Sequence, residues 1–182
     1  MFNIDNVYKI PNFLTEKEIE GLDHYSDHYV WEFAGISDDT PLARTFWVKN
    51  LWGSKWGKCR QIEETFKNKI ESILNIKVET ERLYLNGQAH GQCGDLHTDL
   101  LESNNPNEKY ITAVYYTNKE WFPEYGGFTV IIDRQNNMHV VYPQPNSIVI
   151  FDSSLMHVGL EPTIHCREQR VTLAQKMKII GQ

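Results

Sequence analysis

The stretch VETERLYL, Val78 to Leu85, marks the point where the hydrophobic pattern of this 182-residue chain changes from a helical to an extended period. From here on, short runs rich in β-branched and aromatic residues are separated by Gly, Pro and Asn, as is typical of β-strands and turns. Five further runs of this kind are YITAVYYT (110–117), FTVIID (128–133), MHVVY (138–142), SIVIFDS (147–153) and RVTLAQKMKI (170–179). Strands at such short spacing predict an antiparallel sandwich or barrel.

The residues before this point have a different pattern. Thr15 followed by Glu18 forms a capping-box sequence, which predicts a helix from Thr15 to about Tyr29. RTFWVKNLW (44–52) is β-branched and aromatic and predicts a strand. A second helix is expected from a cap at Ser54 to about Asn75, because its apolar residues recur at helical spacing. The sequence therefore predicts a mostly β protein with two N-terminal helices packed on one side.

Length and charge narrow the class of protein. A chain of 182 residues suits one domain, 1–182, with N-terminal helical support at about 1–77 and a β core at about 78–182. A hydrophobic content of 41% excludes disorder, and no apolar run approaches the roughly 18 residues that span a bilayer. A formal charge of −6 disfavours nucleic acid and anionic membranes as partners, because both attract a basic surface. A small molecule or a polypeptide is the better candidate.

The N-terminal residues and the cysteines indicate the compartment. MFNIDNVYKIPNFL has neither the basic nor the apolar region of a secretion signal, so a cytoplasmic location is expected. Cys59, Cys93 and Cys166 are odd in number and include no Cys-x-x-Cys, which argues against a disulfide framework and against a zinc ribbon.

A candidate metal site begins with His97 and Asp99, two residues apart in GDLHTDLLES. On a β-strand, side chains at i and i+2 share a face, so both could bind one cation. The pair alone is a weak signal and needs a third ligand. Of the remaining candidates His139, His157 and His165, we favour His157, which follows a buried-looking strand and precedes a glycine. Two imidazoles and one carboxylate form the facial set that leaves positions open on non-haem Fe(II).

A candidate anion site lies in the last strand. Arg170 carries a forked, permanently charged guanidinium that can hold a carboxylate through two parallel hydrogen bonds. Thr172 lies on the same face of the strand as Arg170. Arg167 is three residues away and would point to the opposite face, and it is kept as the alternative. In ITAVYYTN, Thr112, Val114 and Tyr116 share one face, so a tyrosine hydroxyl could reach the same carboxylate.

The order His97-x-Asp99, His157, Arg170-x-Thr172 resembles that of the 2-oxoglutarate and Fe(II)-dependent dioxygenases, and specifically of the prolyl hydroxylases, including the oxygen-sensing ones. The likeness covers about the C-terminal hundred residues. The segments that resemble this family are RLYLNGQ (82–88), AVYYTNKEWFPEYGGFTVI (113–131) and PQPNSIVIFDSSLMHVGLEP (143–162).

The resemblance implies a double-stranded β-helix, also called a jelly roll or cupin-like fold, and a set of residue roles. His97, Asp99 and His157 would hold iron. The distal carboxylate of 2-oxoglutarate would be bound by Arg170 and Tyr116, with Thr172 beside them and with Tyr84 lining the pocket near the cofactor.

The implied reaction is the hydroxylation of a C–H bond, with O2 consumed and with succinate and carbon dioxide released; the use of ascorbate is compatible with it. A prolyl residue in a peptide or protein is the favoured substrate. The alternatives are the same chemistry on a free amino acid or other small molecule, and a non-catalytic β-helix that only binds.

Two features depart from the family pattern. The segment between His157 and Arg170 is a few residues longer than expected, and Lys176 stands where a tryptophan is common in relatives. These departures concern the substrate more than the cofactor.

Overall fold

The computed structural model describes residues 2–26, 29–37, 43–51, 58–100 and 104–181 of the chain. Within these residues the helices are α1 (Glu16–Ser26), α2 (Lys58–Leu74) and the short 3-10 helix η1 (Pro123–Tyr125). The strands are β1 (Tyr8–Ile10), β2 (Glu32–Gly35), β3 (Phe46–Asn50), β4 (Lys77–Gln88), β5 (Tyr110–Tyr116), β6 (Thr129–Ile132), β7 (Met138–Val141), β8 (Ile148–Asp152), β9 (Met156–Gly159) and β10 (Arg170–Gly181).

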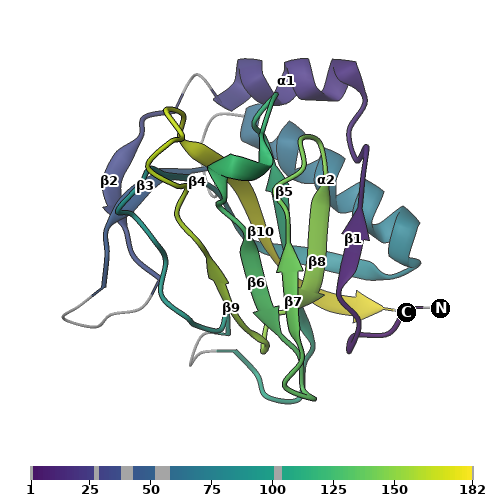
Figure 1. Cartoon of the computed structure of the whole chain (residues 1–182). Helices are drawn as coiled ribbons and strands as arrows, with labels where there is room; N and C mark the ends of the chain where they lie inside the picture. The colour runs from purple at the N-terminus through teal and green to yellow at the C-terminus, as the bar shows by residue number, and fades with distance from the viewer. Residues whose placement is uncertain (1, 27–28, 38–42, 52–57, 101–103, 182) are drawn as a thin grey trace.

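The strands form two antiparallel sheets that face each other (Figure 1). The larger sheet has the order β1-β8-β5-β10-β4-β3-β2, and the smaller one has the order β7-β6-β9. Strands that are distant in sequence pair directly, because β10 lies between β4 and β5 along its length. The fold is the double-stranded β-helix that the family resemblance implies, with both helices on the outer side of the larger sheet.

The helix boundaries follow local signals. Thr15 and Glu18 form the predicted capping box, with the Thr15 amide donating to the Glu18 carboxylate at 2.7 Å and the Glu18 amide lying 3.4 Å from the Thr15 hydroxyl. Helix α2 ends as expected before Asn75, which has a positive φ of 53° and so stops the helix in the left-handed region. The predicted cap Ser54 lies outside the described residues. Neither α1 nor α2 is long and apolar enough to cross a membrane.

The two faces of the larger sheet have different neighbours. One face packs against α1 and α2 through a continuous core that includes Phe66, Ile70 and Tyr115. The opposite face contacts the smaller sheet through a second cluster around Tyr116, Ile131 and Phe151. Because alternate residues of a strand point to opposite faces, the tyrosine pair in YITAVYYT is divided between these two cores. The space left between the two sheets contains the candidate site.

Residues 1–77, which the sequence analysis describes as helical support, also contribute strands to the larger sheet. Besides the predicted β3, they add β1 and β2 at the two edges of the larger sheet. β1 has three residues and β2 has four, mostly exposed, so neither carries the alternating pattern that identifies a strand in a sequence. Strand β9, which carries His157, was also not predicted as a strand; it pairs with β6 in the smaller sheet.

Candidate metal centre and its cavity

A cavity of ≈ 530 Å³ lies between the sheets, and its floor is formed by β3, β4, β5 and β10. The floor is built of cross-strand pairs, because side chains opposite each other on neighbouring strands share a face. Along β10 and β4 these pairs are Arg170 with Gln88, Thr172 with Asn86, Ala174 with Tyr84, and Lys176 with Arg82. All eight residues line the cavity.

Strand β9 and the segment that contains His97 and Asp99 form a wall of the cavity and carry the predicted metal ligands. His97 and His157 form an isolated antiparallel bridge in which each amide donates to the carbonyl of the other residue, at 3.0 Å and 2.8 Å. The amide of Asp99 donates to the carbonyl of Ser153 at 2.9 Å. Over its described residues, 94–100, the segment around His97 makes a single bridge, and it is not the strand that the sequence analysis assumed.

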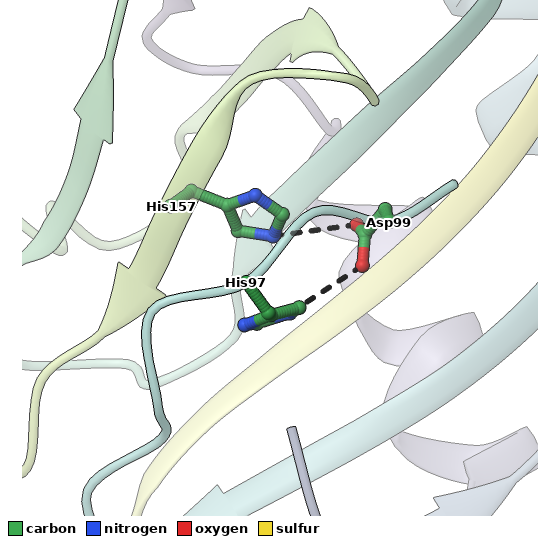
Figure 2. A group of neighbouring side chains, drawn as sticks. All are labelled: His97, Asp99 and His157. Atoms are coloured by element: carbon green, nitrogen blue, oxygen red, sulfur yellow. Dashed lines mark ion pairs between the residues drawn. The ribbon is translucent and has the colours of Figure 1, made fainter. Parts of the chain in front are cut away.

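Figure 2 shows His97, Asp99 and His157 converging from β9 and from the extended segment beside it. His97 Nε2 lies 3.5 Å from Asp99 Oδ1, and His157 Nε2 lies 3.4 Å from Asp99 Oδ2. One ligand atom of each residue lies within 4.8 Å of the others, which leaves room for one cation between them. The other two candidate ligands are remote from this group: His139 pairs with Asp133 in the β6–β7 turn, and His165 is exposed.

The anion-binding residue Arg170 lies at one end of the same cavity and is almost fully buried, with 3% of its surface exposed. Its Nε donates to the Gly127 carbonyl at 2.6 Å, one terminal nitrogen donates to Gln88 Oε1 at 2.8 Å, and the other donates to Thr129 Oγ1 at 2.8 Å. A guanidinium has five N–H groups, so one N–H on each terminal nitrogen remains for a ligand. The alternative, Arg167, is exposed and outside the cavity lining.

The family model of the 2OG-Fe(II) oxygenase superfamily matches residues 82–176, more than half of the chain and the part that builds this cavity. The chain belongs to this superfamily. As an oxygenase of this family it uses Fe(II) and 2-oxoglutarate. A comparison with curated proteins gives no match.

Solved structures similar to the oxygenase have the same fold at low sequence identity. An oxidoreductase of the 2OG-Fe(II) oxygenase family from Burkholderia pseudomallei has a TM-score of 0.74 and 12% identity, with 94% of this chain and 84% of that chain covered. A Trichoplax adhaerens prolyl hydroxylase in complex with a hypoxia inducible factor peptide has a TM-score of 0.70 and 15% identity, with 97% of this chain and 84% of that chain covered. The α-ketoglutarate-dependent epimerase SnoN of nogalamycin biosynthesis has a TM-score of 0.68 and 11% identity, with 96% of this chain and 78% of that chain covered.

The donor set of the oxygenase fits a divalent iron. His97 Nδ1 lies 2.7 Å from the Asp95 carbonyl, and His157 Nδ1 lies 2.9 Å from the Leu155 carbonyl. Because a carbonyl only accepts, each Nδ1 must carry the proton, which leaves the lone pair of each Nε2 facing the carboxylate. Two neutral imidazoles and one carboxylate are the ligands that non-haem Fe(II) favours.

Asp99 is held as an anion at the centre of this set. Its burial opposes ionisation, but hydrogen bonds from His157 and His97 when their imidazoles are protonated, together with the nearby Lys176 charge, keep the pKa of Asp99 well below its usual range. The hydroxyl of Thr112 donates to Asp99 Oδ2 at 2.7 Å, and Lys176 Nζ lies 2.5 Å from Asp99 Oδ1. Burial resists protonation of His97, yet Asp99 outweighs it and raises the pKa of that imidazole.

Tyr84 and Thr172 face the cavity, whereas Tyr116 lies behind its lining. The Tyr116 hydroxyl donates to Thr129 Oγ1 at 2.8 Å. Thr129 thus accepts from both Tyr116 and Arg170, so its own hydroxyl proton is left to donate toward the cavity that it lines. Asn86 Oδ1 also lies in the lining, buried and without a hydrogen-bond partner among the described residues.

Sequence reasoning assigned no role to three residues of the cavity lining, Thr112, Thr129 and Gln88, or to Gly127, which contacts Arg170. Thr112 lies in a predicted strand, four residues before the candidate Tyr116 and therefore on the same face. Thr129 also lies in a predicted strand, but that strand carries no candidate residue that would mark its cavity face. Gln88 could have been found as the cross-strand partner of Arg170 only if the register were known. Gly127 has a φ of 69°, and a Cβ there would lie 3.0 Å from Arg170 Cδ, so close approach of the arginine requires a glycine.

Proposed function

We propose that this oxygenase hydroxylates a prolyl residue in a peptide or protein, with His97, Asp99 and His157 as the iron ligands. The observation that supports it most strongly is that the three side chains and Arg170 line one cavity although they come from separate parts of the chain. Removal of a single ligand is expected to abolish turnover.

Arg170 binds the distal carboxylate of 2-oxoglutarate in this proposal. Its two remaining N–H groups and the Thr129 hydroxyl supply donors for that carboxylate. Tyr116 acts by holding Thr129, since its hydroxyl bonds to Thr129 and its ring lies 5.6 Å from the Arg170 guanidinium carbon. Thr172 and Tyr84 line the path between Arg170 and Asp99.

When bound, Fe(II) would activate O2 and 2-oxoglutarate would give up two electrons and carbon dioxide, so that one oxygen atom of O2 enters succinate and the other turns the substrate C–H bond into C–OH. The chain contributes ligand orientation, a charged clamp at one end of the cavity and walls that exclude water from the reacting carbon. Thr112 holds the Asp99 carboxylate in place, and the backbone carbonyls of Asp95 and Leu155 fix the imidazole orientations.

The prolyl substrate is inferred from the resemblance of the sequence to prolyl hydroxylases and from the similarity to the Trichoplax adhaerens prolyl hydroxylase. The similarity to an epimerase of nogalamycin biosynthesis keeps a small-molecule substrate as the second candidate. We further propose that the whole chain acts as one domain, because β1, β2 and β3 are hydrogen-bonded into the same sheet as the C-terminal strands.

The test is 2-oxoglutarate turnover by the full chain with added Fe(II), measured as succinate release, first alone and then with proline-containing peptides or free amino acids. A peptide that raises succinate release and gains 16 mass units on proline supports the proposal. If free amino acids raise succinate release and no peptide does, the result would favour the second candidate, a small-molecule substrate. Wild-type turnover in H157A would refute the metal assignment.

A further inference from the structure

The end of the cavity opposite Arg170 carries a second pair of cations. Lys176 lies six residues after Arg170 on β10, roughly 20 Å along the strand at about 3.3 Å per residue, and its cross-strand partner on β4 is Arg82. Both heads lie against the same Tyr84 ring, at 5.2 Å for the Arg82 guanidinium carbon and 5.6 Å for Lys176 Nζ. Both residues line the cavity.

Arg82 has no anionic partner among the described residues. Its guanidinium makes no hydrogen bond or ion pair there, and its one described contact is with the Tyr84 ring. Other cations of the sheet are matched: Lys77 pairs with Glu71 at 2.6 Å, and Lys178, two residues beyond Lys176, pairs with Glu108 at 2.6 Å. An exposed arginine facing into a cavity and left unpaired is available for a ligand.

Among the described residues, the only carboxylate that pairs with Lys176 is Asp99, which the metal also needs. Its ammonium is buried against Asp99, and burial lowers the pKa of Lys176 while Asp99 offsets part of that effect. Glu32 is the other carboxylate of the lining, and it lies on the exposed edge strand β2. A divalent cation on Asp99 would therefore leave Lys176 and Arg82 with positive charge in excess at this end of the cavity.

We propose that the substrate of this oxygenase carries a carboxylate that Arg82 and Lys176 bind, at the end of the cavity opposite Arg170. This inference rests on the proposed function and specifies its substrate class. A forked guanidinium and an ammonium that lie near the same aromatic ring can hold a carboxylate through charge-assisted hydrogen bonds. The Tyr84 hydroxyl lines the same cavity, makes no hydrogen bond among the described residues and can donate to the same group, since burial and the Asp99 charge raise its pKa and keep it protonated.

The carboxylate can have two sources. It can be the side chain of Asp or Glu next to the proline of a peptide, or the α-carboxylate of a free amino acid. The chemistry at Arg82 and Lys176 is the same in both cases, so the probes must separate them.

The test measures binding by calorimetry under anaerobic conditions, with the full chain loaded with Mn(II) and 2-oxoglutarate. The peptide probes are acetylated and amidated, contain one proline, and differ only in Glu against Gln beside it. The small-molecule probes are L-proline and L-prolinamide. The variants are R82M and R82E, and the matched controls are R60M and R60E, because Arg60 is an exposed residue of α2, on the outer side of the sheet.

In at least one pair of probes, the wild type is expected to bind the member with the carboxylate about tenfold more tightly than the member with the amide. R82M should reduce this preference to below about threefold and R82E should invert it, while the Arg60 controls keep it. Equal affinities within every pair, including no measurable binding of either member, would overturn the inference, as would an undiminished preference in R82E.

Affinities for Mn(II) and 2-oxoglutarate are measured in parallel. If the wild type binds neither, the proposed function itself fails. If the wild type binds both but does not discriminate between acidic and neutral probes, only the carboxylate inference fails. A loss of 2-oxoglutarate affinity in R82M that exceeds its loss for the acidic probe would assign Arg82 to the cosubstrate and overturn the inference.

Discussion

His97 and His157 are joined by two backbone hydrogen bonds, each amide donating to the carbonyl of the other at 3.0 Å and 2.8 Å. The same two residues present their Nε2 atoms to opposite oxygens of Asp99. Because the bridge is made by the backbone, a change of side chain at either position removes a ligand without removing the bridge.

The first prediction is therefore that H97A and H157A fold but lose metal-dependent stabilisation. Metal at about a hundred times its dissociation constant should stabilise the wild type by about 2.7 kcal/mol, because it binds only the folded state. The variants should gain nothing. Thermal unfolding with and without Mn(II) measures this, and a variant whose Tm rises with Mn(II) as much as that of the wild type would exclude that histidine as a ligand.

The second prediction concerns Thr112, whose hydroxyl holds Asp99 Oδ2 at 2.7 Å. T112V keeps the shape of the side chain but removes this donor, so Asp99 loses its orientation. Metal affinity should fall by roughly 10- to 100-fold, as is usual when a partner of a ligand is lost. The matched control is T65V on α2, where the Thr65 hydroxyl bonds to the Gln61 carbonyl outside the cavity. Equal metal titrations of T112V and the wild type would contradict the role of Thr112.

The third prediction separates the two candidate arginines. R170M removes a charged group that supplies hydrogen bonds, each of which is worth about 1.5–3 kcal/mol, so 2-oxoglutarate affinity should drop by at least roughly tenfold. R167M removes an exposed guanidinium and should leave the affinity unchanged. Titration of 2-oxoglutarate into the Mn(II)-loaded proteins measures both affinities. A loss of affinity in R167M but not in R170M would assign carboxylate binding to Arg167.

The fourth prediction concerns the glycine beneath Arg170. G127A places a methyl group 3.0 Å from Arg170 Cδ and 3.1 Å from Trp121 Cζ2 at a φ of 69°, whereas G91A has a φ of 86° with nothing within 4 Å. Both changes should lower the free energy of unfolding by about 1 kcal/mol, because alanine is strained at positive φ. Only G127A should also weaken 2-oxoglutarate binding. Urea unfolding and ligand titration of the two variants test this, and unaltered binding in G127A would show that Arg170 tolerates the displacement.

The fifth prediction is a pH effect in the β6–β7 turn. His139 Nε2 lies 2.9 Å from Asp133 Oδ2, and hydrogen bonds from His139 and Asn137 lower the pKa of Asp133 from 3.8 to about 2. Because the folded pKa is depressed, the stabilisation is present above the unfolded value and is lost as the pH falls from about 4 through 2. In H139A the Asp133 pKa should rise toward 3.8, as followed by carboxyl carbon NMR. An unchanged value would mean that the hydrogen bonds from Asn137 and Gln135 set it without His139.

Much of the secondary structure was predictable because its signals are local. The Thr15–Glu18 capping box, the end of α2 at Asn75 and the alternating runs after Val78 each depend on a few adjacent residues. β2 and β9 were missed because their four-residue runs become strands only through pairing with β3 and β6, which lie elsewhere in the chain.

The candidate site was predictable in part for the same reason. His97 and Asp99 stand two residues apart, and Arg170 and Thr172 share a strand face, so both pairs can be read from spacing. The contact of Lys176 with Asp99 could not be read in this way, because it joins β10 to an extended segment whose position depends on its bridge to His157.

The sequence by itself determined which residues have the chemistry to bind iron and a carboxylate, and where both α-helices and most of the strands lie. These properties depend on residue type, on alternation along a strand and on turn residues, all of which act over short distances. The tertiary structure alone decided that Gln88 and Thr129 orient Arg170, that Tyr116 acts from behind Thr129, and that Arg82 faces the cavity beside Lys176. Such relationships depend on the register between strands that are far apart in the chain, and register is set by the packing of both sheets together.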